Sequence, residues 1–177
     1  MNLFVMMFLV VLLAGISPSA GIALDENGKG RREGNTEGSG QAVKTLYAKE
    51  CGACHLAYQP QFLPKRSWVK IMDTLGDHFG ENASLDEVAR AQILAHLVSN
   101  SAEGSRSKRS RKILSSIKDT ETPLRISDTP YFKKEHDEFP PDVFKRKSIV
   151  SPANCAACHP EAEKGDFNEH RVKIPKN

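Results

Sequence analysis

A five-residue motif occurs twice in this chain and uses all four of its cysteines. The first copy is Cys51-Gly52-Ala53-Cys54-His55 and the second is Cys155-Ala156-Ala157-Cys158-His159. Cys-x-x-Cys-His is the attachment sequence of c-type haem, in which two thiols add to the porphyrin and the adjoining imidazole binds the iron. One helical turn brings such closely spaced side chains together. The sequence therefore predicts two covalently attached haem c groups, with Cys51, Cys54, Cys155 and Cys158 as attachment sites and His55 and His159 as proximal iron ligands.

Other uses of closely spaced cysteines are possible in principle. Two disulfides, or redox or zinc pairs, would explain the thiols but not a histidine repeated at the same offset. Because the haem motifs use every cysteine, we expect no structural disulfide.

The composition favours a fold that depends on its cofactor. The chain has 177 residues with 7% aromatic content, so each half is small enough to need a covalent cross-link or a bound cofactor for stability. The formal charge is +3, with 9 Lys/Arg against 11 Asp/Glu in residues 1–103 and 16 against 11 in residues 104–177. The basic excess indicates a solvated surface or, alternatively, a docking face for an acidic partner.

The N-terminus resembles an export signal. Residues 1–24 carry no charged side chain, and a run of apolar residues ends in Ser17-Pro18-Ser19-Ala20-Gly21. We predict a signal peptide over residues 1–23 and a periplasmic protein, with an uncleaved membrane anchor as the alternative. Residues 24–41 are rich in Gly and charged residues and predict a disordered linker.

Residues 42–103 predict three helices around the first motif. An apolar stripe leads from Ala42 into Cys51. A second helix is expected from an N-cap at Ser67 to a stop at Gly80, and a third from a capping box of Ser84 and Glu87 through about Val98. This order is similar to that of a class I cytochrome c domain.

Residues 104–177 predict a second haem-binding domain of a different kind. Residues 102–112 are rich in Ser, Gly and Arg and are expected to be a linker; with an export signal present, their basic residues do not indicate nucleic-acid binding. Seven prolines follow between Pro123 and Pro175. We expect an irregular domain with short helices near residues 131–138 and around the second motif, so the fold class is mainly α.

The sixth iron position decides the function of a haem protein. Outside the predicted signal Met72 is the only methionine, and its position on an apolar helical stripe predicts core packing. His78 continues that stripe and His136 lies between Phe132 and Phe139, so we predict these two as distal ligands. His96 is expected to pack on the first helix, and His170 is the rival of His136.

Two sets of strings resemble the dihaem cytochrome c family of proteobacteria. The first set spans Tyr47 to His55, Leu63-Pro64 with Ser67-Trp68, and Asp77 to Ala83; the second spans Pro123 to Ile126, Thr129 to Phe132 with His136, Asn154 to Pro160, and Gly165 to Phe167. The resemblance implies periplasmic electron transfer by two low-potential haems with bis-His ligation, and His78 and His136 stand where the family has its distal ligands. It also implies redox partners such as a monohaem oxygen-binding cytochrome c or a membrane b-type cytochrome.

Two function classes remain after the sequence is considered. We expect an electron carrier and not an enzyme, because two imidazoles hold iron in the same coordination in both oxidation states. The alternative is a haem enzyme of peroxidase type, or a gas sensor, with one open or labile distal site.

Overall fold

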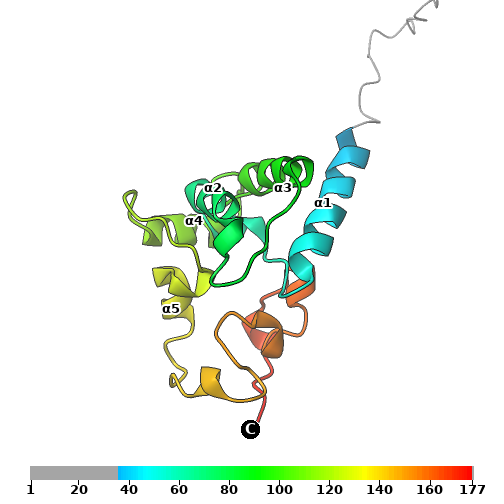
Figure 1. Ribbon diagram of the computed structural model, residues 1–177. Helices are drawn as coiled ribbons and strands as arrows, with labels where there is room; N and C mark the ends of the chain where they lie inside the picture. The colour runs from blue at the N-terminus through cyan, green and yellow to red at the C-terminus, as the bar shows by residue number, and fades with distance from the viewer. Residues whose placement is uncertain (1–35, 177) are drawn as a thin grey trace, which may run out of the picture. The chain divides into compact units, whose positions relative to one another are not determined.

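The computed structural model describes residues 36–176, with side chains from Ser39 onward, and residues 35–177 form one compact unit. The predicted signal peptide and residues 24–35 of the predicted linker lie outside the described residues. In the described part the regular structure is helical, apart from one bridge between His78 and Glu81. The prediction of a mainly α fold is confirmed (Figure 1). Among the described residues, no helix has the length and apolar character needed to cross a membrane.

Three helices build the first half: α1 (Thr36–Gly52), α2 (Lys65–Asp73) and α3 (Glu87–Ser99). Helix α3 packs against both α1 and α2. Their apolar faces form one buried cluster, which includes Met72 as predicted and consists of Tyr47, Leu63, Trp68, Ile71, Met72, Ile93 and Leu97. The Trp68 indole donates a hydrogen bond of 2.7 Å to the Pro60 carbonyl, which satisfies its buried N–H. The first half thus has a buried apolar core to which all three helices contribute.

Helix α1 begins at Thr36, six residues before the predicted start at Ala42. The prediction that residues 36–41 belong to a disordered linker is therefore wrong. Ser39 to Ala42 are exposed, so this end of the helix does not require an apolar period in its sequence. Each residue added to an existing helix gains one hydrogen bond, and no new helix nucleus has to form. A Gly-containing segment can therefore extend α1.

The caps of α2 and α3 differ from those predicted. Pro64 and not Ser67 precedes α2, and Ser67 lies fully buried inside that helix. Helix α2 ends at Asp73, where the Thr74 hydroxyl donates to the Lys70 carbonyl at 2.9 Å. Helix α3 is capped by Asp86, whose carboxylate accepts from the Ala89 N–H at 2.9 Å, so the Ser84 capping box is wrong. An Asp directly before the helix satisfies one of the N–H donors of the first turn, and its negative charge suits the helix N-terminus.

The second half contains short helical segments, as its prolines predict. Helix α4 (Lys108–Ser116) is followed by the 3-10 segment η3 (Ile126–Asp128) and by helix α5 (Pro130–Glu135). After α5 come the 3-10 segments η4 (Val143–Lys145), η5 (Cys155–Ala157), η6 (Ala162–Lys164) and η7 (Glu169–Arg171). The predicted linker 102–112 is corrected at both ends. Ala102 is buried with its N–H bonded to the Leu63 carbonyl, and Ser107 caps α4 by accepting from the Ser110 N–H.

The two halves contact each other within this unit. Phe62 of η1 (Pro60–Phe62) forms a buried cluster with Ile113 and Ile117 of α4. The Tyr58 hydroxyl donates to the Ala153 carbonyl at 2.8 Å. The division into haem-binding domains at 42–103 and 104–177 stays a prediction.

Candidate haem-binding sites

The first motif starts in the last turn of α1 and leaves the helix with His55. Cys51 is part-buried, and burial, followed by the charge of Glu50, raises its thiol pKa to about 11. The His55 ring stacks on Tyr58 with centroids 5.0 Å apart and planes 23° from parallel. Nδ1 of His55 lies 2.7 Å from the Leu56 carbonyl, which only accepts, so that nitrogen carries the proton. Nε2 is then the nitrogen that remains for a metal.

His78 lies on a tight turn and not on the helical face predicted from the sequence. Its N–H donates to the Glu81 carbonyl at 2.7 Å and the Glu81 N–H returns a bond of 3.3 Å. The two residues between them, Phe79 and Gly80, have φ values of 59° and 97°. Positive φ at both central positions defines a type I′ turn, which glycine adopts freely and phenylalanine rarely does. The helix predicted to run through His78 to Gly80 ends at Asp73 instead. An α-helix cannot continue through this turn, because the turn needs positive φ values at Phe79 and Gly80.

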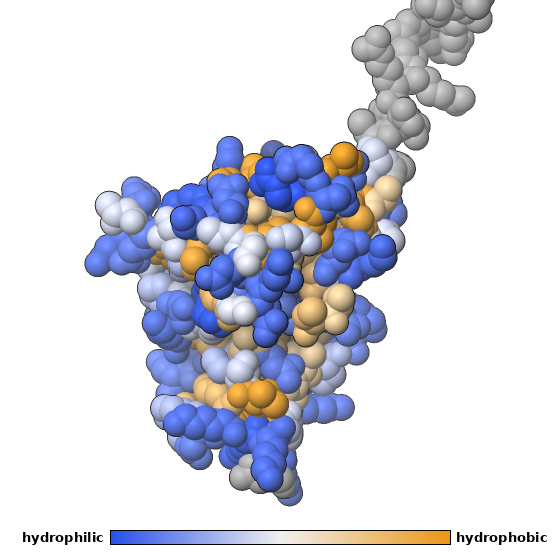
Figure 2. All heavy atoms as spheres, in the orientation of Figure 1, coloured by the Kyte–Doolittle hydropathy of each residue, from blue (hydrophilic) through white to orange (hydrophobic). Residues whose placement is uncertain are grey.

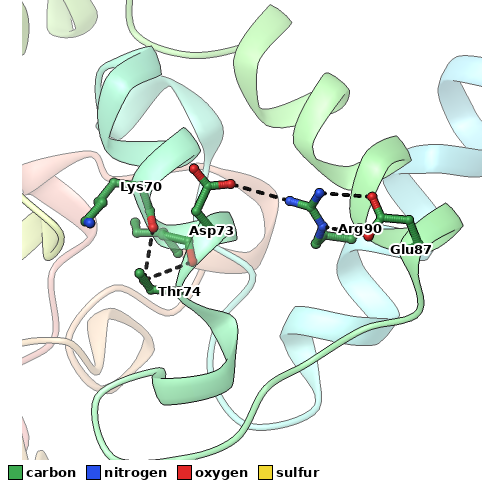
Figure 3. Close-up of polar contacts among 6 residues, drawn as sticks. Lys70, Asp73, Thr74, Glu87 and Arg90 are labelled. Atoms are coloured by element: carbon green, nitrogen blue, oxygen red, sulfur yellow. Dashed lines mark hydrogen bonds and ion pairs between the residues drawn. The ribbon is translucent and has the colours of Figure 1, made fainter.

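The turn that carries His78 is anchored at both ends (Figure 3). Before it, the Thr74 hydroxyl closes α2. After it, Arg90 of α3 bonds both Asp73 at 3.5 Å and Glu87 at 3.0 Å, which ties the end of α2 to the start of α3. The Ala83 N–H also donates to the Leu75 carbonyl at 2.9 Å, closing the loop across its base.

The structure brings His78 close to His55. Their ring centroids lie 6.1 Å apart and their planes differ by 27°. Two imidazoles on opposite sides of one metal have centroids about 6 Å apart, from two metal–nitrogen bonds of about 2 Å and two ring radii of about 1.1 Å. The spacing fits a shared iron. Burial, then the charges of His55 and Arg125, lower the pKa of His78, so its neutral and metal-binding form is favoured.

Arg125 contacts the turn from the other half of the chain. Its guanidinium carbon lies 3.7 Å from the centroid of the Phe79 ring, within cation–π range. Phe79 in turn packs edge-on against His78 with centroids 4.8 Å apart. Arg125 therefore covers the residue whose backbone the turn strains.

The second motif lies on the 3-10 segment η5. The His159 N–H donates to the Cys155 carbonyl at 2.8 Å, which closes one turn around the motif. Burial raises the Cys155 thiol pKa to about 11 and also raises that of Cys158. The His159 pKa is lowered, first by burial and then by the charges of His136 and Arg109, with Asp166 opposing. No disulfide joins any of the four cysteines in the structure.

His136 is the C-cap residue of α5. Its Nδ1 donates to the Phe132 carbonyl at 2.8 Å, the same arrangement as in His55, and leaves Nε2 for a metal. The ring also stacks on Phe132 with centroids 4.0 Å apart and planes 18° from parallel. Its centroid is 6.3 Å from that of His159, with planes 75° apart. This spacing again fits two imidazoles on one iron.

The His136 and His159 side chains line a cavity of about 420 Å³. Of the described histidines, only His136 and His159 line it. Both cysteines of the motif and many apolar side chains complete the wall, among them Phe132, Phe139, Phe144, Ile149 and Phe167. Size and lining match an apolar cofactor pocket, so the residues present fit a covalently held haem.

The remaining candidates lie elsewhere. His170 is on η7 with its side chain 84% exposed, 3.7 Å from the Glu169 carboxylate. His96 packs on Tyr47 of α1 with ring centroids 5.7 Å apart, as expected for a structural residue. The structure thus pairs each motif histidine with the predicted distal histidine of its own half, while the ligand roles stay predictions.

Two residues near the sites were not singled out from the sequence. Tyr58 stacks on His55 and bonds Ala153 beside the second motif. Arg109 of α4 lies over the Phe62 and Phe167 rings, 5.9 and 5.7 Å from their centroids, and lines the second cavity. Neither has a signal in the local pattern, because each acts across the interface of the two halves.

Comparisons with known proteins agree with this geometry. A family model described as dihaem cytochrome c matches residues 47–167. A solved diheme cytochrome c from Rhodobacter sphaeroides is 48% identical, with a TM-score of 0.63 and 70% of this chain and 95% of that chain covered. A structure of DHC purified from Rhodobacter sphaeroides is 45% identical, with a TM-score of 0.57 and coverage of 70% and 96%. A diheme cytochrome from Shewanella baltica is 34% identical, with a TM-score of 0.61 and coverage of 75% and 94%. Among curated protein sequences, none matches this chain.

Proposed function

The chain belongs to the dihaem cytochrome c family, and we propose on this basis that it is a low-potential electron carrier of the periplasm with bis-His ligation at both irons. Membership of the family implies two covalently bound haem c groups. Each haem supplies an iron that takes up and releases one electron. The role of the polypeptide is to hold, orient and partly shield the two groups.

The observation that carries the proposal is the spacing of two imidazole pairs. His55 and His78 have centroids 6.1 Å apart, and His136 and His159 have centroids 6.3 Å apart. Two unrelated local structures, a hairpin turn and a helix C-cap, give the same separation. A shared requirement at both sites, two nitrogens on one metal, explains this agreement.

The low potential follows from the ligands available. Met72 is 3% exposed within the first core cluster, so a thioether ligand would require that core to open. Methionine ligation raises the potential of a c-type haem, and imidazole at both positions keeps it lower. We therefore expect no high-potential component in a redox titration.

The visible spectrum of the reduced holoprotein, with and without carbon monoxide, tests the carrier function. No change on adding carbon monoxide is expected, because both irons keep two firmly held imidazoles. Potentiometric titration of the same sample is expected to give reversible waves only. A shift in half or all of the haem signal would contradict the proposal.

A second function, ligand binding at one haem, is favoured by one observation. His78 stands on a turn that holds a phenylalanine at φ 59°, and such strain lowers the barrier to rearrangement. In this case carbon monoxide would shift about half of the haem signal. The shift would disappear if the first motif were removed by Cys51→Ala and Cys54→Ala.

Location and partners are proposed from the family resemblance and the N-terminal sequence. An apolar, uncharged N-terminus and covalent haem both suit export to the periplasm. Fractionation of cells of a c-type cytochrome-producing bacterium tests this. A monohaem oxygen-binding cytochrome c or a membrane b-type cytochrome is the proposed partner, to be tested by electron exchange in stopped flow.

A further inference from the structure

The basic excess of the second half is concentrated in one segment. Residues 104–118 carry six Lys or Arg and no Asp or Glu, whereas residues 119–177 carry ten and eleven. Outside this segment the second half has no basic excess. The segment forms α4 and its N-terminal approach.

Helix α4 has one face packed against the protein and one face exposed to solvent. Ile113 and Ile117 at its end point into the cluster with Phe62, and Arg109 lies over two phenylalanine rings. Lys108, Arg111 and Lys112 are exposed and share the opposite face, since residues three and four apart are neighbours on a helix. Arg106 is exposed just before the N-cap, and its carbonyl accepts from the Arg111 guanidinium at 2.6 Å.

Within the part of the chain that the structure describes, no ion pair neutralises this exposed face. Among the ion pairs of residues 39–176, none involves Arg106, Lys108, Arg111 or Lys112. The cations also stand in the first turns of α4, where the helix dipole disfavours positive charge. The arrangement lowers the stability of the free protein, and an external acidic surface would remove the penalty.

The face adjoins the second haem-binding cavity. Arg109 and Ile113, on the inner side of the same helix, both line that cavity. In Figure 1, α4 packs beside α5, the helix that ends at His136, and hydrophilic residues cover this side in Figure 2. A partner seated on α4 would therefore be separated from the second haem pocket by one helix.

We propose that the exposed basic face of α4, made of Arg106, Lys108, Arg111 and Lys112, is the docking surface for an acidic redox protein that exchanges electrons with the second haem. The inference rests on the proposed carrier function. Opposite charges steer encounter and orient two proteins without a large buried area, which suits a transient electron-transfer complex.

A carboxylate-terminated monolayer on a gold electrode serves as the acidic surface in the test. The holoprotein with Lys108→Glu and Lys112→Glu is compared with a variant carrying Lys44→Glu and Lys49→Glu, two exposed lysines of α1, so that both variants have the same net charge. Glutamate at residue 108 lies in the first turn of α4 and complements the helix dipole, so the variant is expected to fold.

We expect interfacial electron transfer to be about tenfold slower in the α4 variant than in the α1 variant, and the difference to vanish at high ionic strength. On a hydroxyl-terminated monolayer both variants should match the unaltered protein. Equal rates of the two variants on the carboxylate surface would overturn the docking proposal while leaving the carrier function intact. Irreversible or absent redox waves on both surfaces would overturn the carrier function, and the docking proposal with it.

Discussion

The two candidate haem sites hold their predicted distal histidines in different ways. His78 lies on a type I′ turn between α2 and α3, whereas His136 ends α5 and bonds the carbonyl of Phe132 one turn earlier. The half of the chain with the first pair has a packed core of apolar side chains, whereas the second pair lines a cavity of about 420 Å³. The comparison teaches that the first half carries its haem as an addition to a packed fold, while the second half is organised around its haem.

Loss of one attachment motif is expected to give the largest difference in stability between the two halves. Cys155→Ala with Cys158→Ala is expected to unfold residues 119–176. Without the haem, the apolar side chains that line this cavity would face water, and the loss of their burial is large beside a small domain's whole stability of about 5–15 kcal/mol. Limited proteolysis with mass spectrometry of the fragments measures the effect.

The matched variant is Cys51→Ala with Cys54→Ala, which leaves the α1–α3 cluster in place. Its first half should remain resistant to protease. Equal protection of both halves in both variants would show that the second half has a core of its own. The conclusion that only the second half is organised around its haem would then be wrong.

Removal of each distal histidine tests the two pairings separately. His78→Ala should convert the first haem alone to a high-spin form, and His136→Ala the second alone, so about half of the haem signal changes in each variant. Electron paramagnetic resonance of the ferric protein gives the readout. His170→Ala is the control and should leave the spectrum unaltered, because that side chain is exposed. A high-spin signal in the control would make His170 the second distal ligand.

Arg109 should tune the second haem alone. A cation in the wall of the second cavity favours the reduced state, so Arg109→Gln should lower one of two reduction potentials. An effect on the order of 1 kcal/mol corresponds to about 40 mV for a one-electron couple. Spectroelectrochemical titration resolves the two waves. A shift of both waves by the same amount would point to a change in general packing instead.

Arg125 should affect the first site alone. Arg125→Gln removes the cation from the Phe79 ring, a contact worth about 0.5–1 kcal/mol at an exposed site. Cyanide binding at the first haem should tighten about two- to fivefold, because the turn that holds His78 loosens. Arg125→Lys, which keeps the charge, should restore part of the original affinity. An unchanged cyanide titration would mean that Thr74 and Arg90 suffice to hold the turn.

The smallest expected effect is a pH dependence confined to the first half. Burial, then the charge of Lys44, lowers the pKa of His96 from 6.5, while the Tyr47 ring and the Asn100 amide are its other neighbours. The unfolded chain then binds more protons below pH 6.5, so stability is greatest above that pH and falls as the pH decreases. Denaturant midpoints at pH 7.5 and 5 should differ less in His96→Gln than in the unaltered protein. An identical pH response of the two would exclude His96 as the cause.

Local sequence patterns predicted some elements of the fold and missed others. The apolar stripe of α1 and the burial of Met72 follow from helical periodicity, and the contact of His96 with the first helix was expected from the resemblance to class I cytochromes c. The caps at Ser67 and Ser84 were wrong because α2 begins directly after Pro64 and α3 directly after Asp86, and a pattern alone does not decide between adjacent candidates. The start of α1 was missed because exposed residues leave no periodic signal.

The sequence by itself determined the cofactor chemistry, since two Cys-x-x-Cys-His motifs are local and covalent attachment needs only neighbouring residues. It also pointed to His78 and His136, by elimination of methionine and by family resemblance. Tertiary structure decided what no local pattern contains: that His78 stands on a hairpin turn, that Arg125 covers this turn from the other half, and that Arg109 lines the second cavity. These contacts join residues far apart in the chain, and their geometry depends on how the helices pack.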